Sequence, residues 1–316
     1  MINNTELSKL TFGCEPLGGT DWGKVDIDAI YKAINRAVER GINVFDVADV
    51  YGLGKAEIEL SKALGSFRKD AFIITKFGVR WEKSNFGGRA FTYMDSSPSY
   101  LIKALHDSLK RLKIDAIPLY LIHWPDNKIN IEETIIALEK VKSEGKIMNY
   151  GISNFFSEST FLLFNDFNIS AFQGPINLID YKKSDLIFKQ AKKQNITTFS
   201  YSPLAQGLFT GKYDSSSRFD QSDRRHRLIH FQPEHWEKNN KILNILNKLS
   251  IKYNRPISQI AIRWVIDNCK IDSVVVSAKN VDQVDSNIDS LEFTLQQEDI
   301  DKLNISVGYP AGAACN

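Results

Sequence analysis

The sequence predicts an α/β fold, a closed (β/α)₈ TIM barrel in which helices surround eight parallel strands. Eight short runs rich in Ile, Val, Phe and Tyr recur along the chain, and helical patterns of about 10 to 15 residues separate most of them. The runs show little polar alternation, which is typical of strands covered on both faces. No GxGxxG follows the first run and no break divides the units into halves, so an open doubly wound sheet is disfavoured.

The predicted strands are enriched in β-branched and aromatic residues and are bounded by turn-forming residues. In chain order they are Leu10–Cys14, Ile42–Asp46, Phe72–Lys76, Ile117–His123, Asn149–Ser153, Ser170–Gln173, Thr197–Ser202 and Ser273–Ser277.

The predicted helices fill the gaps between these strands. Asp28–Arg40 carries a single apolar stripe and stops at Gly41. Pro98–Leu112 begins after Ser96-Ser97, which suits a cap with proline in the first turn. The other predicted helices are Lys55–Leu64, Ile131–Ser143, Ser157–Asn165, Ser184–Gln194, Trp236–Ser250, Pro256–Asn268 and Val281–Ile288.

Two connections are much longer than the rest. Phe77–Ser97 follows the third predicted strand, and Pro203–His235 follows the seventh. Connections of this length in a compact domain are usually lids or binding loops. No linker, repeat or low-complexity tract interrupts the chain, so we expect one domain over residues 1–316.

Composition is that of an ordinary globular protein, with 43% hydrophobic and 25% charged residues. A net charge of +2 gives no reason to expect nucleic acid or an anionic membrane as partner. The sequence shows no signal peptide and no membrane-spanning stretch, so we expect a cytoplasmic protein. The three cysteines, Cys14, Cys269 and Cys315, are widely spaced without a CxxC, which favours a reducing compartment over a disulfide framework.

Four polar residues follow strands at the end of the barrel where such folds carry their chemistry. Asp46, Lys76 and His123 end the second, third and fourth strands, and Tyr51 follows Asp46 by five residues. Taken singly, three have ordinary explanations, as a helix cap, a half-buried aromatic and a core histidine. Lys76 differs because an unpaired ammonium is costly to bury, so we expect Asp46 on the neighbouring strand to pair with it.

Together these four residues suit proton transfer to a carbonyl oxygen. A phenol has a pKa of about 10, and we expect the Lys76 ammonium to lower the pKa of Tyr51 while Asp46 holds the ammonium in place. His123 can orient the substrate oxygen. None of the four supplies electrons, so a cofactor is required. At other strand ends, Ser153, Asn154 and Gln173 could bind a carboxamide and Tyr201 could stack on a planar ring.

A metal centre is the competing chemical interpretation of the same strand ends. His123, Asp46 and Cys14 would offer mixed zinc ligands, but the chain lacks HxxxH and CxxC spacing. We therefore predict no metal site.

Seven motifs in sequence order resemble those of the aldo-keto reductase family, from about Leu10 to Leu303. FDVADVYG carries Asp46 and Tyr51, ITKFG carries Lys76, and LIHWPD carries His123. GISNF and FQGPINL are similar to nicotinamide-holding segments of the family, YSPLAQGLFTGKY to its pyrophosphate segment, and VVVSAKNVDQVDSN to its adenosine-phosphate segment. The resemblance implies a barrel that binds NADP(H) in extended form and transfers hydride between nicotinamide and a carbonyl or alcohol.

The resemblance also implies roles for individual residues. Tyr51 would be the general acid/base, Lys76 and Asp46 would tune it, and His123 would orient the carbonyl. The cofactor contacts that it implies are Asp46, Ser153, Asn154, Gln173, Tyr201, Ser202, Pro203, Leu204, Gln206, Gly207, Lys212, Arg224, Ser277, Ala278, Lys279, Gln283 and Asn287.

The adenosine-phosphate segment departs from the family pattern. Many members carry Arg where Gln283 stands and some carry Lys where Ser277 stands, which leaves Lys279 as the basic residue of this segment. NADP(H) is therefore expected, and NAD(H) stays open.

Two further groups of residues have both an ordinary and a functional explanation. Trp22, Trp81, Phe86 and Trp124 lie in loops expected at the barrel mouth, where they either pack the loops or line a substrate pocket with Tyr51 and His123. A basic cluster in the connection after the seventh strand is either a solvated charge run or a clamp on a cofactor or substrate phosphate. It consists of Arg224, Arg225, His226, Arg227 and His230.

The sequence favours an NADP(H)-dependent enzyme that reduces a small aldehyde, ketone or sugar carbonyl. Two alternatives share the same residues. One is an aldose or alcohol dehydrogenase working in the oxidative direction, and the other is a cofactor-binding regulatory subunit similar to the potassium channel β subunits. The sequence names neither the substrate nor the oligomeric state.

Overall fold

The computed structural model describes residues 2, 6–82 and 90–308. Its centre is a closed barrel in which eight strands pair in parallel, in the order β1-β10-β9-β8-β7-β6-β3-β2. This confirms the predicted (β/α)₈ TIM barrel. The strands are β1 (Leu10–Gly13), β2 (Val44–Asp46), β3 (Phe72–Phe77), β6 (Ile117–Ile122), β7 (Ile147–Ser153), β8 (Ala171–Pro175), β9 (Thr197–Tyr201) and β10 (Ser273–Val276).

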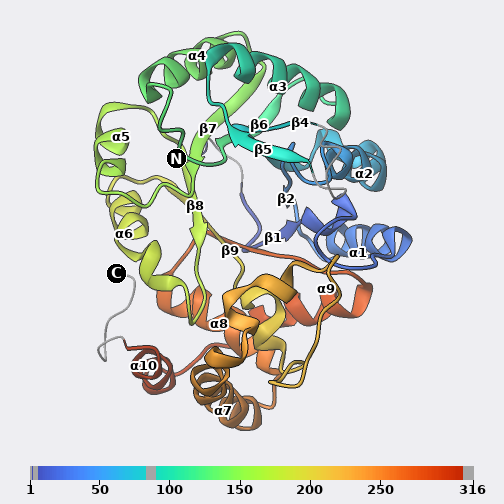
Figure 1. The fold of residues 1–316 in the computed structure, drawn as a ribbon, viewed down its shortest axis with the longest axis vertical. Helices are drawn as coiled ribbons and strands as arrows, with labels where there is room; N and C mark the ends of the chain where they lie inside the picture. The colour runs from blue at the N-terminus through green and yellow to red at the C-terminus, as the bar shows by residue number, and fades with distance from the viewer. Residues whose placement is uncertain (1, 3–5, 83–89, 309–316) are drawn as a thin grey trace.

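Helices form a ring around the strands (Figure 1). They are α1 (Ile27–Glu39), α2 (Lys55–Leu64), α3 (Pro98–Leu112), α4 (Ile131–Ser143), α5 (Thr160–Asp166), α6 (Asp185–Lys193), α8 (Ile257–Cys269) and α9 (Val281–Ile288). Two further helices, α7 (Trp236–Tyr253) and α10 (Gln297–Ser306), pack on each other and on α8 outside this ring. The sequence predicted α7, although it ends three residues later than expected, and it did not predict α10.

The core has two layers, as period-2 alternation in a barrel requires. One set of buried side chains, the interior core set, fills the barrel interior and includes Val44, Ile74, Leu121 and Phe199. The larger set packs between the outer face of the strands and the apolar stripes of the helices. Because alternate residues of one strand point the same way, the interior set identifies which polar residues at the strand ends also face inward.

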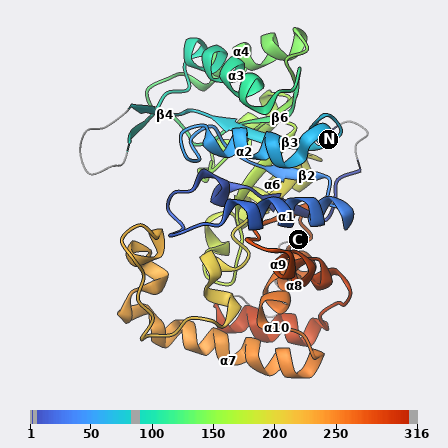
Figure 2. The ribbon, with the colours of Figure 1, turned by 90° about the vertical axis from the view of Figure 1, so that its right-hand side faces the viewer.

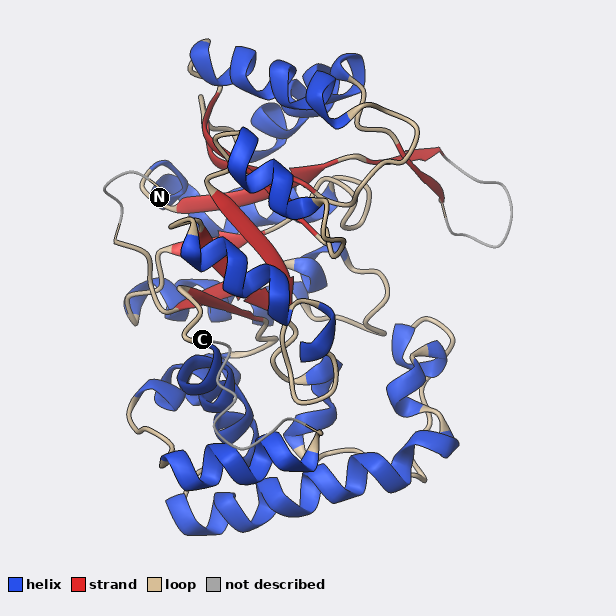
Figure 3. Ribbon diagram, turned by 90° about the vertical axis from the view of Figure 1, so that its left-hand side faces the viewer, coloured by secondary structure: helices blue, strands red, loops and turns tan. Residues whose placement is uncertain are grey.

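The two long connections lie at the same end of the barrel (Figures 2 and 3). The first contains an antiparallel hairpin, β4 (Val79–Glu82) and β5 (Phe91–Met94), which the sequence did not predict. Most of its side chains are at least partly exposed, so it lacks the apolar alternation that signals a strand. The second connection forms the short 3₁₀ turns Ala205–Thr210, Arg224–Arg227, Ile229–Phe231 and Pro233–His235.

The sequence also gave expectations about the cysteines and about membrane-spanning helices. Cys14 is a buried free thiol, and Cys269 is also buried. Cys315 lies outside the described residues. Among the described helices, none has the length and hydropathy to cross a bilayer.

Candidate active site

The polar residues at the barrel mouth form the top layer of its interior. Asp46, Lys76 and His123 each lie two residues after a member of the interior core set, namely Val44, Ile74 and Leu121. The same holds for Gln173 after Ala171, Tyr201 after Phe199 and Ser277 after Val275. Strand alternation therefore directs all six side chains toward the barrel axis.

Lys76 is held by a buried ion pair. Its Nζ donates to Asp46 Oδ1 at 2.8 Å and to the Val47 carbonyl at 2.8 Å, and its side chain is only 1% exposed. Gln173 Nε2 donates to the other Asp46 oxygen at 2.8 Å. The predicted pairing of Lys76 with Asp46 is confirmed, and both carboxylate oxygens are occupied, which fixes the ammonium at the centre of the mouth.

Tyr51 lies beside this pair. The Lys76 Nζ is 5.2 Å from the centroid of the Tyr51 ring, and the His123 ring meets that ring edge-on at 5.8 Å between centroids. The backbone at Tyr51 is fixed by close packing, because a Cβ on Gly52 would stand 2.4 Å from the Gly18 carbonyl oxygen. The structure thus brings together all four residues of the predicted constellation.

The electrostatics at Tyr51 differ from the prediction. Burial raises the pKa of the Tyr51 phenol well above its ordinary value, and the Glu15 and Asp46 carboxylates raise it further, with Arg224 opposing them. The expectation that Lys76 lowers this pKa is therefore wrong in its net direction. The reason is that burial of the phenol, reinforced by the two carboxylates, outweighs the stabilisation that nearby cations give to the phenolate. The phenol stays protonated at neutral pH, which is the form of a proton donor.

His123 is a neutral imidazole at neutral pH. Burial, and then the Lys76 charge, lower the pKa of its ring well below the ordinary value. Its Nδ1 is buried and has no hydrogen-bond partner within the described part of the chain. A neutral ring offers one N–H donor, so His123 can orient a carbonyl oxygen without competing as an acid.

The predicted carboxamide-binding residues lie beside His123 and Asp46 at the mouth. Asn154 Nδ2 donates to the His123 carbonyl at 2.9 Å and to Ser153 Oγ at 3.1 Å, and Tyr201 donates its hydroxyl to Asn154 Oδ1 at 2.7 Å. Ser153 stands opposite Gln173 in the β7–β8 register. This group links the proposed cofactor side of the mouth to His123.

Backbone strain marks the same region. The non-glycine residues Asn154, Ser202, Ala205 and Gln206 all have positive φ. Such conformations are uncommon and tend to gather at functional sites, where the surrounding structure enforces them. Gln206 Nε2 donates to Ser202 Oγ at 3.0 Å, which ties the turn after β9 together. The sequence offered no signal for this strain.

The segment after β10 leads into the N-terminus of α9. The Lys279 backbone N–H donates to Gln283 Oε1 at 2.8 Å, and Asn280 caps the helix by accepting from the Gln283 N–H at 3.0 Å. Asn287 Nδ2 donates to the Ser277 carbonyl at 3.4 Å. A helix N-terminus beside a lysine suits a phosphate group.

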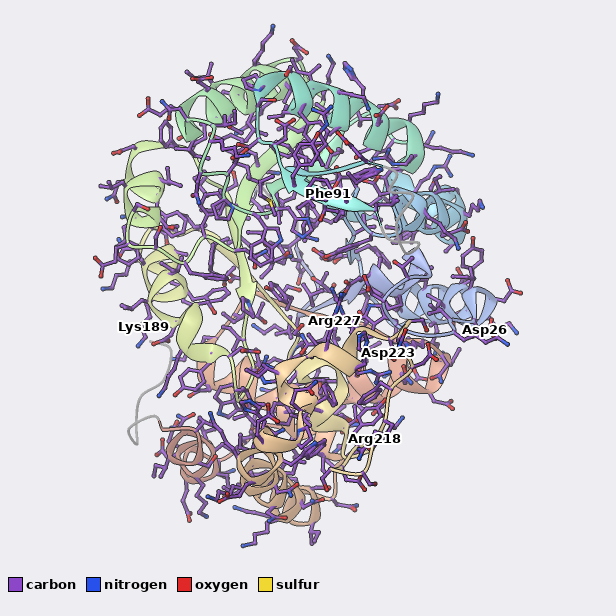
Figure 4. All side chains as sticks on the ribbon, viewed as in Figure 1. Asp26, Phe91, Lys189, Arg218, Asp223 and Arg227 are labelled. Carbon is purple, nitrogen blue, oxygen red and sulfur yellow. The ribbon has the colours of Figure 1, made fainter. Side chains whose placement is uncertain are left out.

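The basic cluster proves to be paired rather than free. Arg224 Nη1 donates to Glu15 at 2.6 Å, and its guanidinium lies over the Trp22 ring at 5.5 Å. The remaining pairs are Arg225 with Asp223, Arg227 with Asp21 and His230 with Asp180. The contacts of Arg224 and Arg227 join the connection after β9 to the loop after β1, and Figure 4 labels Asp223 and Arg227 there. A freely solvated charge run does not describe this cluster.

The predicted aromatic residues lie at different places. Trp124 is 40% exposed, with its ring 6.5 Å from that of His123. Trp22 lies under Arg224 and Lys279. Trp81, on β4, lines a cavity against α3. Phe86 is outside the described residues, and the substrate roles of the other three remain predictions.

Glu15, which lies near the site, is a strand-end residue to which the sequence analysis gave no role. It lies two residues after the end of β1 and begins the turn Glu15–Gly18, whose backbone packs against Tyr51 and Gly52. Its carboxylate raises the pKa of Tyr51 and binds Arg224. Its position just after a barrel strand is the sequence feature from which a role at the site could have been predicted.

Known proteins resemble this chain over almost its full length. The structure of the glycerol dehydrogenase AKR11B4 from Gluconobacter oxydans superposes with a TM-score of 0.87 and 31% identity, covering 96% of this chain and 92% of that one. The aldo-keto reductase yakc [NADP(+)] of Schizosaccharomyces pombe is 28% identical over 99% of this chain and 94% of its own. The NADH-specific methylglyoxal reductase of Escherichia coli is 28% identical, with coverages of 93% and 92%.

The family model for the aldo/keto reductase family matches residues 9–307, which include every barrel strand and all four residues of the constellation. With the barrel, the buried Lys76–Asp46 pair and this match together, the chain belongs to the aldo/keto reductase family.

Proposed function

We propose that this protein is a nicotinamide-dependent oxidoreductase that reduces an aldehyde, ketone or sugar carbonyl, with Tyr51 as the proton donor. The observation that carries the proposal is the buried Lys76–Asp46 ion pair beside the Tyr51 ring and the His123 ring. Family membership supports oxidoreductase chemistry. We further propose that the whole chain acts as one catalytic domain, with a small molecule as its partner.

The protonation state of each residue determines its proposed role. Tyr51 holds a proton on its hydroxyl at neutral pH because burial raises its pKa. The neutral His123 ring donates a hydrogen bond to the carbonyl oxygen and aligns it with that hydroxyl. Lys76 stabilises the negative charge that Tyr51 gains as its proton leaves, and Asp46 keeps Lys76 in position. The cofactor supplies the hydride.

The barrel mouth fits a nicotinamide. Ser153, Asn154 and Gln173 place buried polar groups at one side, and Tyr201 offers a ring beside them. The His123 Nδ1 is buried and has no hydrogen-bond partner among the described residues, so it is available for a hydrogen bond with a bound molecule. The turn after β9 and the N-terminus of α9 would hold the phosphates, with Arg224 and Lys279 as candidate cations.

We expect NADP(H) as the cofactor, with NAD(H) as the second possibility. Lys279 should determine the preference by binding the 2′-phosphate. Lys279→Ala should raise the KM for NADPH about tenfold, worth about 1.4 kcal/mol, and leave that for NADH nearly unchanged, because only NADPH carries the 2′-phosphate. Lys241→Ala, on the exposed face of α7, is the control for loss of a positive charge. Equal effects on both cofactors would remove Lys279 from the 2′-phosphate site.

The direction of the reaction should show in its pH dependence. The raised pKa of Tyr51 keeps the donor form present through neutral pH, so kcat/KM for carbonyl reduction should hold and then fall on the alkaline side. Alcohol oxidation needs the deprotonated phenol and should rise with pH in the same range. Steady-state rates in both directions over a pH series give this comparison. A reductive rate that climbs with pH would contradict Tyr51 as the donor.

A panel of sugars, aromatic aldehydes and pyridoxal tests the function itself. Absorbance of NADPH and of NADH should fall with at least one of these carbonyls. A regulatory subunit would bind the cofactor and leave its absorbance constant across the panel, which would refute the proposed function.

A further inference from the structure

The Glu15–Arg224 ion pair lies at the barrel mouth beside Tyr51. Glu15 begins the turn Glu15–Gly18, and the backbone of this turn packs directly on the loop that carries Tyr51. In the barrel, β1 runs between β2 and β10, and β9 is the next strand after β10. Glu15 therefore approaches the mouth between Tyr51, which follows β2, and Tyr201, which ends β9.

The charges of this pair act on both of these tyrosines. Burial raises the pKa of the Tyr51 and Tyr201 phenols, the Glu15 carboxylate adds to the rise at both, and the Arg224 guanidinium opposes it at both. Interactions between charges weaken with distance and are screened by solvent. The pair therefore lies close to both rings, beside the space between the proposed proton donor and the proposed nicotinamide site.

A bound molecule can reach this pair, in contrast to the buried Lys76–Asp46 pair. The side chains of Arg224 and Glu15 are 29% and 27% exposed. Arg224 Nη1 donates to Glu15 Oε1 at 2.6 Å, but Glu15 Oε2 and the Nε and Nη2 of Arg224 have no hydrogen-bond partner within the described residues. None of these three atoms is closed off from solvent.

The atoms left free by the pair suit hydroxyl groups. The charges of Glu15 and Arg224 offset each other, so a charged substrate finds no uncompensated partner there. The free carboxylate oxygen accepts a hydrogen bond and the guanidinium N–H groups donate. A hydroxyl group does both, and two adjacent hydroxyls can contact both side chains.

We propose that Glu15 and Arg224 determine substrate preference by binding the hydroxyl groups next to the reacting carbonyl, so that the enzyme selects neutral polyhydroxy carbonyl compounds. This inference rests on the proposed function, because the carbonyl must lie beside Tyr51. It adds a recognition role for two residues that take no part in the proposed proton transfer.

Steady-state reduction of glyceraldehyde and propanal at saturating cofactor tests the proposal, because the two aldehydes share a carbon chain and differ only in their hydroxyl groups. We expect Glu15→Gln to lower the ratio of kcat/KM for glyceraldehyde to that for propanal by about tenfold or more. The ratio cancels any effect of the variant on Tyr51 that both substrates share. Glu237→Gln removes the carboxylate of an exposed ion pair on α7 and should leave the ratio unchanged.

Glyoxylate should show the opposite response. Its carboxylate finds Arg224 without a charged partner only in Glu15→Gln, so its kcat/KM relative to propanal should rise in this variant. The assays are run at about pH 8, far above the ordinary carboxyl pKa of about 4.3, so that Glu15 is a carboxylate although burial raises its pKa.

Arg224→Gln gives a second test if Glu15→Gln melts abnormally. It should also lower the ratio of glyceraldehyde to propanal, but without a gain for glyoxylate, because the guanidinium is absent. Arg224 is also a candidate cation for the cofactor phosphates, so the cofactor concentration is kept saturating for this variant.

Two results would overturn this inference alone. One is an active wild type whose ratio of glyceraldehyde to propanal is unchanged in Glu15→Gln. The other is a fall in glyoxylate reduction relative to propanal in Glu15→Gln, which would show that the native pair binds anions. If the wild type oxidises neither NADPH nor NADH with any of the three compounds, the proposed function fails, and this inference fails with it.

Discussion

Tyr51→Phe should lose carbonyl reduction by about 10²- to 10⁴-fold in kcat while it keeps its affinity for the cofactor, because it removes only the hydroxyl that donates the proton. The ring, its edge contact with His123 and its packing near Lys76 all persist in this variant. Stopped-flow or steady-state turnover gives the rate, and fluorescence titration with NADPH gives the affinity.

Tyr150→Phe is the matched control for Tyr51→Phe. Tyr150 is also a buried tyrosine, but its hydroxyl donates to Glu139 at 2.6 Å, away from the barrel mouth. This variant should retain turnover. Wild-type rates in Tyr51→Phe would show that another group donates the proton.

Lys76→Met should cost both activity and stability. Activity should fall about as far as in Tyr51→Phe, because the ammonium beside the Tyr51 ring is then absent when the phenolate forms. The free energy of unfolding should drop by about 3–5 kcal/mol, since the variant leaves the Asp46 carboxylate buried with only Gln173 as a partner. Denaturant melts measure the second effect separately from the first.

The double variant Asp46→Asn with Lys76→Met separates the structural role of the pair from its catalytic role. It removes both charges, so most of the lost stability should return. Turnover should stay low because the ammonium is still absent. Recovery of turnover in the double variant would assign Lys76 a purely structural role.

Local signals predicted most of the fold. Helix α3 begins and ends where the sequence indicated, because Ser97 caps it by accepting from the Tyr100 N–H and Lys113 ends it in a left-handed conformation. The β4–β5 hairpin was not predicted because its side chains are mostly exposed and carry no alternating pattern. Helix α10 was missed because its stretch, QEDIDKLNIS, is only weakly apolar and gains its place by packing on α7 and α8.

The site was predictable to the extent that strand alternation determines it. Asp46, Lys76 and His123 could be placed together from their positions at strand ends, and their contacts agree. The pKa of Tyr51 could not be predicted, because it depends on burial and on Glu15, which approaches from the loop after β1. Nor did the sequence show that Trp81 shares a cavity with Asp49, since this depends on the path of the hairpin over α3.

The central claim is spatial, and a crystal structure of the protein with NADP⁺ and a carbonyl inhibitor tests it most directly. We predict the nicotinamide ring on the face of Tyr201, with the inhibitor oxygen within about 3.2 Å of both the Tyr51 hydroxyl and a His123 ring nitrogen. A nicotinamide bound away from the Lys76–Asp46 pair, or an inhibitor oxygen out of reach of Tyr51, would contradict the proposed function.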